Sequence, residues 1–307
     1  MISLAHRWLF ACLLLSTSLI THAAVTLIDA TGARVTLAAP AQRIISLAPH
    51  ITELLYAAGA GGRVVAATDY SDYPAAARDL PRVGSYANID LETVLALRPD
   101  LIVAWKSGNS AAQLDRLRAL GVIVYVSEPH RLDDIPTDIE HLGTLAGSED
   151  NARMAARHFR QRHTRLTERY SKRPLVTVFY EIWNPPLMTI NGAQIISDVL
   201  RLCGGVNVFA DLPVLAPTVD VEAVLQINPE AIFMGDMQNR STDEDNHWQR
   251  WTKLRAVRAG NLFRIPPDLM QRHTPRILQG AEMLCDDLEQ VRARRVDHSV
   301  RKSDSTQ

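Results

Sequence analysis

Short apolar segments alternate with amphipathic segments along most of this 307-residue chain. Seven apolar segments are typical of buried β-strands: RIISLA (43–48), RVVAAT (63–68), DLIVAW (100–105), VIVYVS (122–127), LVTVFY (175–180), AIFMGD (231–236) and NLFRIP (261–266). Helical patterns begin near His50, Asp90 and Asn109, and recur near 194–203, 220–227 and 275–295. Continuous apolar strands that alternate with helices are typical of βαβ units and parallel sheets. The pattern therefore predicts an α/β protein with two Rossmann-like lobes, at 24–147 and 172–296.

The segment between the two lobes, 148–171, is predicted to be one long helix. Apolar residues recur there at intervals of three and four, which gives one apolar stripe: Ala152, Ala155, Phe159, Leu166 and Tyr170. Ser148 is a candidate N-cap, and Glu149 and Asp150 suit the positive end of the helix dipole. Such a helix is roughly 35 Å long. We interpret it as a stiff backbone helix that joins the lobes and allows only a small tilt; the alternative is an ordinary surface helix of a single domain.

The first 23 residues have the organisation of a secretory signal peptide. His6 and Arg7 precede an apolar run from Trp8 to Ile20, and a small-residue stretch ends at Ala23. That order predicts export to the periplasm and cleavage near Ala23. The alternative is an uncleaved membrane anchor, but the run is shorter than the roughly 20 residues that span a bilayer. Cys12 lies inside the apolar run, so we do not expect lipidation. Residues 297–307, at the other end, are predicted to be a disordered tail.

Two cysteines remain after removal of the signal peptide, Cys203 and Cys285. Disulfides persist in an exported protein. A bridge between them would close a loop over 82 residues, for which the chain-entropy model gives a stabilisation of about 4–5 kcal/mol. Two buried free thiols are the alternative. Neither cysteine belongs to a C-x-x-C motif, so the sequence does not indicate redox catalysis.

Composition excludes several functional classes. The chain has 33 Lys and Arg against 34 Asp and Glu, without the basic excess that nucleic acid or an anionic membrane surface requires. The sequence contains no G-x-S-x-G, P-loop or H-E-x-x-H motif, and no G-x-G-x-x-G that opens a helix. Its ten histidines show no metal-ligand spacing. We therefore expect a binding protein without resident cofactor or metal, monomeric in solution, and not an enzyme.

An internal repeat links the two predicted lobes. IDLETVLALRPDLIVA (89–104) and VDVEAVLQINPEAIFM (219–234) align without gaps, and six positions are identical. Each reads as an N-cap Asp, a short helix, a turn with Pro and a buried strand. Acidic residues suit the first turn of any helix, which explains Glu92 or Glu222 alone. The same carboxylate in the same context on both lobes would instead suit a two-fold symmetric partner.

The chain resembles the class of periplasmic binding proteins with a rigid backbone helix, which serve importers of cobalamin, haem and siderophores. It is similar above all to the cobalamin-binding members. Five segments carry the resemblance: YSDYP (70–74), LRPDLIVAW (97–105) followed by KSGN, NPP (184–186), LCGGVNVF (202–209) and DLMQRHTPRI (268–277). The N-terminal stretch 25–42 resembles a hairpin common in the class. The segment 237–251 has no counterpart in it and is predicted to be a surface insertion.

The resemblance implies a periplasmic solute-binding protein that delivers cobalamin to the permease of an ABC importer. It implies a ligand cleft between the lobes, a bridged Cys203–Cys285 pair, and docking of Glu92 and Glu222 onto arginines of a dimeric permease. Carried over residue by residue, the corrinoid contacts fall on Tyr70 and on the stretch Asp268, Leu269, Met270, Gln271 and Arg272.

The chemistry of a corrin agrees with these candidates. A corrin is a wide apolar macrocycle fringed with amides, and it carries a phosphate-linked base. Flat aromatic side chains supply contact area at low entropic cost: Tyr70, Tyr86, Trp105 and Trp183. Asp268, Asn109 and Arg272 are candidates to bind the amides or the phosphate. Core packing is the alternative role for each aromatic residue.

A haem- or siderophore-binding protein of the same class is the nearest alternative function. In that case Tyr70 or Tyr73 would ligate haem iron, with His50 or His273 in support.

Overall fold

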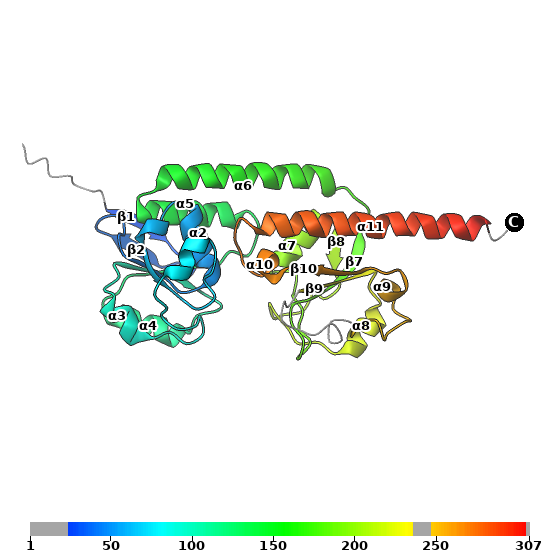
Figure 1. The fold of residues 1–307 in the computed structure, drawn as a ribbon, viewed down its shortest axis with the longest axis horizontal. Helices are drawn as coiled ribbons and strands as arrows, with labels where there is room; N and C mark the ends of the chain where they lie inside the picture. Colours follow the sequence, from blue (N-terminus) through cyan, green and yellow to red (C-terminus); the bar gives the residue numbers. More distant parts are fainter. Residues whose placement is uncertain (1–23, 236–246, 305–307) are drawn as a thin grey trace, which may run out of the picture.

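The computed structural model describes residues 24–235 and 247–304. It contains two four-stranded parallel sheets, one in each lobe (Figure 1). The N-terminal sheet has the order β4-β3-β5-β6, formed by Val64–Ala67, Ile44–Ser46, Leu101–Trp105 and Val124–Ser127. The C-terminal sheet has the order β10-β9-β7-β8, formed by Leu262–Ile265, Ala231–Gly235, Val176–Glu181 and Gly205–Asn207. The predicted two-lobed α/β fold is confirmed.

Helices cover both sheets. The N-terminal lobe contains α2 (Pro49–Ala57), α3 (Leu91–Ala96), α4 (Ala111–Ala119) and α5 (Asp134–Ala146), with two 3-10 turns at Gly61–Arg63 and Ala75–Asp79. The C-terminal lobe contains α7 (Ile195–Leu202), α8 (Val221–Ile227), α9 (Arg255–Arg258), α10 (Pro267–Met270) and α11 (Ile277–Asp304). The N-terminal stretch forms an antiparallel hairpin of β1 (Val25–Ile28) and β2 (Arg34–Leu37).

The long helix α6 spans Glu149–Tyr170 and runs along one side of both lobes (Figure 1). Its buried residues form the expected stripe from Ala152 through Phe159 to Tyr170, except that Ala156 is buried in place of the predicted Ala155, which is half-buried. Ser148 occupies the N-cap position, but its capping role was predicted wrongly. Its hydroxyl donates instead to the carbonyl oxygen of Ala58, at 2.7 Å, because α2 lies within reach.

Ion pairs fasten α6 to each lobe in turn. The guanidinium of Arg160 forms two hydrogen bonds of 2.7 Å with the carboxylate of Glu140 in α5. Two residues later, Arg162 makes the same forked contact with Glu282 in α11, at 2.8 and 2.6 Å. Bidentate pairs of this kind fix orientation as well as distance. Helix α6 therefore holds the two lobes in one defined arrangement.

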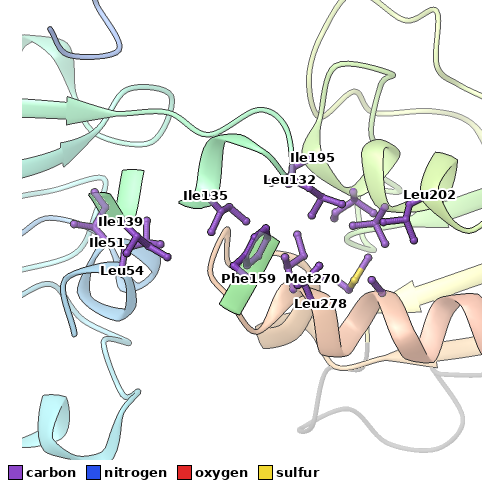
Figure 2. Packing of buried hydrophobic residues seen from close by; sticks show 14 of the residues in the cluster. Ile51, Leu54, Leu132, Ile135, Ile139, Phe159, Ile195, Leu202, Met270 and Leu278 are labelled. Carbon is purple, nitrogen blue, oxygen red and sulfur yellow. The ribbon is translucent and has the colours of Figure 1, made fainter. Parts of the chain in front are cut away.

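A shared apolar core reinforces that arrangement (Figure 2). One continuous cluster of buried side chains begins at Ile51 and Leu54 in α2, passes Phe159 of α6, and reaches Leu202 in α7 and Leu278 in α11. Interiors of this kind are close-packed and bistable rather than continuously deformable. The lobes therefore behave as one packed body near α6.

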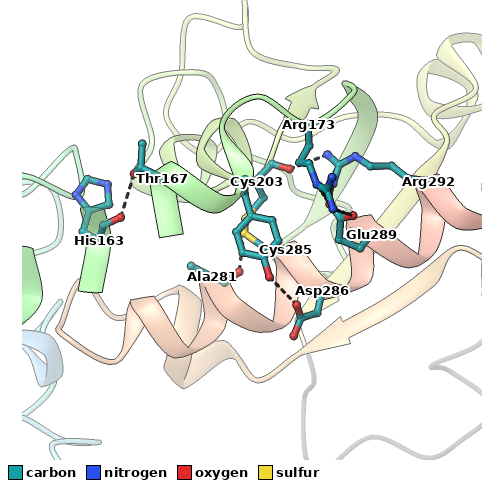
Figure 3. The surroundings of a disulfide bond; sticks show 10 residues. His163, Thr167, Arg173, Cys203, Ala281, Cys285, Asp286, Glu289 and Arg292 are labelled. Carbon is teal, nitrogen blue, oxygen red and sulfur yellow. Dashed lines mark hydrogen bonds and ion pairs between the residues drawn. A yellow bond between two sulfur atoms is a disulfide. The ribbon is translucent and has the colours of Figure 1, made fainter. Parts of the chain in front are cut away.

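The disulfide predicted between Cys203 and Cys285 is confirmed (Figure 3). It joins the end of α7 to α11 with a Cα–Cα distance of 4.8 Å, and both cysteines are fully buried. Beside it, the hydroxyl of Tyr170 in α6 donates to Asp286 of α11 at 2.8 Å. The C-terminal ends of α6 and α7 are thus both anchored to α11.

Three predicted segments differ from the structure or lie outside it. The signal peptide, 1–23, lies outside the described residues. Helix α11 continues to Asp304, beyond the end predicted for the C-terminal lobe at residue 296. The segment 237–251 is not simply a surface insertion, because Trp248 is fully buried and its indole N–H donates to Glu181 at 2.7 Å. Residues 236–246 lie outside the described part of the chain.

Candidate ligand-binding cleft

The carboxyl ends of the parallel strands face the boundary between the lobes, where ligands bind in open α/β sheets. Strand β5 ends there at Trp105, and β10 leads into the short helix α10. A cavity of about 320 Å³ lies at this boundary, within the usual size range of ligand pockets. Both lobes line it: Trp105, Ser107, Glu128, Pro129 and His130 from one, and Ile182, Gln194, Ile195, Ile196, Leu215, Ala216, Gln271 and His273 from the other.

Trp105 forms the centre of an aromatic group on the N-terminal side of the cleft. Its ring centroid lies 5.1 Å from that of His50 and 5.8 Å from that of Tyr86. Asn109 holds this group in place. Its amide donates to the carbonyl oxygens of Leu47 and Tyr86, at 2.9 and 2.7 Å, and its side-chain oxygen accepts from the N–H of Trp105 at 2.6 Å. Asn109 is therefore a positioning residue, and its proposed contact with ligand amides is not supported.

Tyr70 lies in the loop that follows β4, with a strained backbone φ of 63° and a side chain 76% exposed. Its neighbour Ser71 anchors the loop to α2, because the Ser71 hydroxyl lies 3.1 Å from that of Thr52. Non-glycine residues in left-handed conformations concentrate at functional sites. An unusually exposed aromatic ring on an anchored loop is well suited to contact a flat ligand.

Arg272 sits among carboxylates from both lobes. One guanidinium nitrogen lies 2.6 Å from Asp72 and 3.1 Å from Glu53, both in the N-terminal lobe, and the other lies 3.0 Å from Asp268. Burial raises the pKa of Asp72, but the hydrogen bond and charge of Arg272 outweigh it and leave the pKa of Asp72 below its ordinary value. The positive charge of Arg272 is thus already compensated, which argues against its predicted role as a phosphate receptor.

The other predicted contacts, from Asp268 to Gln271, differ in their burial. Met270 was predicted wrongly: it is fully buried in the shared core, packed against Gly280 of α11, and does not reach the cleft. Leu269 is half-buried, and Asp268 and Gln271 are exposed. Gln271 lines the cavity and donates to the carbonyl oxygen of Ile182 at 3.2 Å. Of the predicted stretch from Asp268 to Arg272, only Gln271 lines the cavity.

Trp183 lies at the end of β7, 43% exposed, with its indole N–H donating to the carbonyl oxygen of Pro185 at 2.7 Å. The strand end beside it is held from within the lobe. Glu181 accepts from Trp248 at 2.7 Å and lies 3.2 Å from His247. This support was not predicted from the sequence, because Trp248 is far from Glu181 in the chain and no local pattern marks it.

The sequence analysis also missed several residues that line the cavity, such as Glu128, His130 and Gln194. Glu128 and His130 could have been predicted from their positions in the sequence. They directly follow β6, and the residues after parallel strands are where α/β proteins build binding sites. Gln194, at the start of α7, has no comparable pattern.

His50 and His273 are buried and lie with ring centroids 5.7 Å apart. Burial, reinforced by the charge of His130, lowers the pKa of His273 to about 4. Burial, with His273 and Arg272 nearby, also lowers the pKa of His50 well below its ordinary value. His50 Nε2 and His273 Nδ1 are buried without a hydrogen-bond partner, and Tyr73 packs under Arg276 at 4.1 Å. No group of three potential metal ligands occurs within 24–235 and 247–304.

Glu92 and Glu222 are both exposed and occupy the second position of α3 and α8. The two helices lie on the same edge of the molecule, away from α6 (Figure 1). The repeat extends to the backbone, because Arg98 and Asn228 at the corresponding helix ends have φ of 45° and 53°. Asp90 caps α3 by accepting from the Thr93 N–H at 3.1 Å, whereas Asp220 forms no such bond and was wrongly predicted to cap α8.

Comparisons with known proteins agree with this architecture. Residues 44–269 match the family described as periplasmic binding protein. The vitamin B12-binding protein of Vibrio parahaemolyticus is 37% identical over 83% of this chain and 92% of its own length. The crystal structure of the periplasmic vitamin B12-binding protein BtuF of Vibrio cholerae is 39% identical, with a TM-score of 0.78 over 82% of this chain and 98% of that one.

A more distant structure has the same fold. The periplasmic haem-binding protein RhuT of Roseiflexus is 20% identical, with a TM-score of 0.72 over 81% of this chain and 98% of that chain. Within the described residues, no helix has the length and apolar character needed to span a membrane. The fold, the matched family and the extent of both alignments lead to one conclusion: the chain belongs to the periplasmic binding protein family.

Proposed function

We propose that this protein captures a corrinoid, cobalamin, between its lobes and delivers it to the dimeric permease of an ABC importer. One observation carries the proposal: Trp105 lines a cavity whose lining contains no Lys or Arg, the partly exposed ring of Tyr86 lies 5.8 Å from Trp105, and Trp183 directly follows Ile182 of the lining. A wide, amide-fringed macrocycle matches such a surface, since aromatic faces bind its apolar area and uncharged or acidic groups accept its N–H donors. The vitamin B12-binding relatives, 37–39% identical, support the same assignment.

Four aromatic residues are the proposed contact surfaces for the corrin. Tyr70, Tyr86 and Trp183 are 76%, 42% and 43% exposed, and Trp105 lines the cavity itself. The cavity, at about 320 Å³, is too small to enclose a whole corrinoid, so we propose that the corrin lies over these rings and extends only part of its fringe into the cavity. Asp268 and Gln271 are the proposed acceptor and amide contacts at its edge.

Export and delivery complete the proposal. Residues 1–23 act as a signal peptide, cleaved near Ala23, which places the mature protein in the periplasm. Glu92 and Glu222 then contact basic residues on the two halves of the permease. The proposal rests on their matched positions on α3 and α8, which suit a partner with two-fold symmetry.

A spectroscopic and calorimetric titration tests the ligand. The mature protein should bind cyanocobalamin with a defined stoichiometry and should bind haemin much more weakly. Tyr70→Ala should weaken cyanocobalamin binding about tenfold, because a buried aromatic contact of this size contributes 1–2 kcal/mol. Leu175→Ala is the matched control, since Leu175 is also largely exposed, at 65%, but lies at the start of β7, away from the cavity lining.

The same titration contains the outcomes that oppose the proposal. Absence of cyanocobalamin binding by the wild-type protein would remove the corrinoid function. Tight haemin binding with a changed visible spectrum would establish the haem alternative instead.

A further inference from the structure

Five charged side chains form a contact between the lobes, which we call the clasp: Glu53, Asp72, Asp268, Arg272 and Arg276. Glu53 in α2 accepts from Arg276 through both oxygens, at 2.8 and 2.5 Å, and lies 3.1 Å from Arg272. Arg272 also pairs with Asp72 and Asp268, at 2.6 and 3.0 Å. The clasp thus links α2 and the Tyr70 loop of one lobe to the α10–α11 segment of the other.

The clasp buries Glu53 and both arginines and exposes its two aspartates. The side chains of Arg272 and Arg276 are only 14% and 16% exposed, and that of Glu53 is 2% exposed. Those of Asp72 and Asp268 are 48% and 53% exposed. Three carboxylates pair with two guanidinium groups, so the clasp carries a formal excess of one negative charge, and its exposed members are the two aspartates. The surface that it presents to a ligand is therefore acidic.

The nearby cavity has the same character. Glu128 lines it, and none of the residues described as lining it is Lys or Arg. Two cations close to the aromatic contacts donate to backbone oxygens: Lys106 to Ala30, at 3.1 Å, and Arg82 to Ser71, also at 3.1 Å. An anionic group on a ligand would thus meet carboxylates along this side of the cleft, and the closest guanidinium groups are already paired.

We propose that the clasp is a specificity determinant, with Asp268 and Asp72 accepting hydrogen bonds from amide groups at the edge of the macrocycle and repelling carboxylates at the same positions. This inference rests on the proposed corrinoid function and deepens it. A primary amide donates to a carboxylate, whereas a second carboxylate adds like-charge repulsion and no donor, and such mismatches build specificity by rejection. Macrocycles fringed with carboxylates, such as haem with its propionates, are excluded by the same surface. Arg272 acts as a positioning residue that holds both aspartates in place.

The test compares cyanocobalamin with the mono-acids obtained when one of its side-chain amides is hydrolysed. Each mono-acid differs from the parent only by one carboxylate in place of one amide. For the wild-type protein, at least one mono-acid should bind roughly tenfold more weakly than cyanocobalamin at low salt. Asp268→Asn should reduce that ratio to about twofold or less, since it removes charge and preserves shape. High salt should also reduce the ratio, because the carboxylates are half exposed and therefore screened.

Asp115→Asn is the matched control. Asp115 is an exposed carboxylate on α4 that pairs with Arg118, away from the cavity lining, so the ratio should stay at its wild-type value. The inference is wrong if wild-type protein binds every mono-acid as tightly as cyanocobalamin, or if Asp268→Asn leaves the ratio unchanged. A protein that does not bind cyanocobalamin at all would instead contradict the proposed function, so the two failures are distinguishable.

Discussion

Asn109 shows that a polar residue near the cleft can stabilise the local backbone through hydrogen bonds within the protein. One amide holds the backbone of Trp105 and Tyr86 at 2.6 and 2.7 Å, and Arg272 likewise holds two aspartates. Truncation of a buried partner in such a network leaves its counterpart unsatisfied, which costs about 1–3 kcal/mol. Loss of ligand binding in a variant at these positions would therefore report lost geometry rather than lost contact.

Asp138 provides a residue-scale prediction about pH. Burial, together with the nearby charges of Asp134 and Glu128, raises its pKa to about 6, against the opposing hydrogen bond from the hydroxyl of Ser127. The pKa in the folded state is thus above the unfolded value, so the folded state favours the protonated carboxyl. The contribution of Asp138 to stability is fully present below about pH 4 and is lost as the pH rises through 6.

Asp138→Asn should therefore make the protein more stable than the wild type at pH 7.5, by about 1–3 kcal/mol, and the difference should vanish near pH 4. Urea denaturation of both proteins across this range measures the difference directly. The free energies of unfolding of the two proteins are compared at each pH, because the lowered pKa values of His50 and His273 make both proteins less stable in acid. A difference that does not change with pH would show that Asp138 titrates normally.

At the scale of elements, the repeated unit of helix, turn and strand has the same construction in both lobes. Helices α3 and α8 are each followed, within two residues, by a residue with positive φ and then by Pro and an acidic residue. That acidic residue then binds the backbone beside the neighbouring strand: Asp100 accepts from the Arg43 N–H at 2.9 Å, and Glu230 from the Thr177 N–H at 3.1 Å. The repeat thus keeps a carboxylate, as Asp in one lobe and Glu in the other, at the position that binds the neighbouring strand.

The disulfide provides the element-scale prediction, because it ties α7 to α11. Replacement of both Cys203 and Cys285 by Ala should lower the free energy of unfolding by about 4 kcal/mol, as loop entropy predicts for the 82-residue separation. Ligand affinity should stay close to that of the wild type, since neither cysteine lines the cavity. Denaturation of the oxidised, reduced and double-variant proteins measures the effect. Free thiols at both cysteines, detected by mass spectrometry of the exported protein, would contradict the prediction.

The sequence predicted elements better than it predicted contacts, for a physical reason. Continuous apolar runs and helix periodicity are local, so seven of the eight strands in the two parallel sheets lie within their predicted ranges or one residue beyond them. Strand β8 was not predicted, because its three residues follow a glycine and are too few to show a periodic pattern. The burial of Met270 and Trp248 and the pairing of Arg272 with Asp72 depend on residues from distant parts of the chain, which no local pattern encodes.

On the scale of the whole molecule, α6 and the proposed docking glutamates lie at opposite sides. Helix α6 runs along one side, and α3 and α8 lie at the other, one on each lobe (Figure 1). The shared core and the clasp connect the lobes between these two sides. Because packed interiors do not deform continuously, the separation of Glu92 and Glu222 is set by the fold. A partner with two contact points at the same spacing can therefore bind both glutamates at once.

Reversal of both docking charges tests this arrangement. Glu92→Arg together with Glu222→Arg should abolish transport and stimulation of transporter ATPase in reconstituted vesicles, while the affinity for cyanocobalamin stays unchanged. Each exposed pair contributes about 1 kcal/mol, and reversal replaces attraction by repulsion at both points, so binding to the permease should weaken by roughly 1000-fold. Each single reversal should have an intermediate effect, since one contact point remains.

The matched control is the double variant Asp150→Arg with Glu168→Arg, which changes the net charge equally but lies on α6, at the opposite side of the molecule. It should support normal uptake, because its charges lie far from the proposed interface. Equal loss of uptake in both double variants would mean that net charge, rather than position, controls delivery. Normal uptake by the Glu92 and Glu222 variant would show that these carboxylates only stabilise the first turns of α3 and α8.

Thermal unfolding of the single variants tests that local role. Both helices have an acidic residue at the same position, but only α3 has a side-chain cap. A purely local role should therefore affect the stability of the two lobes unequally.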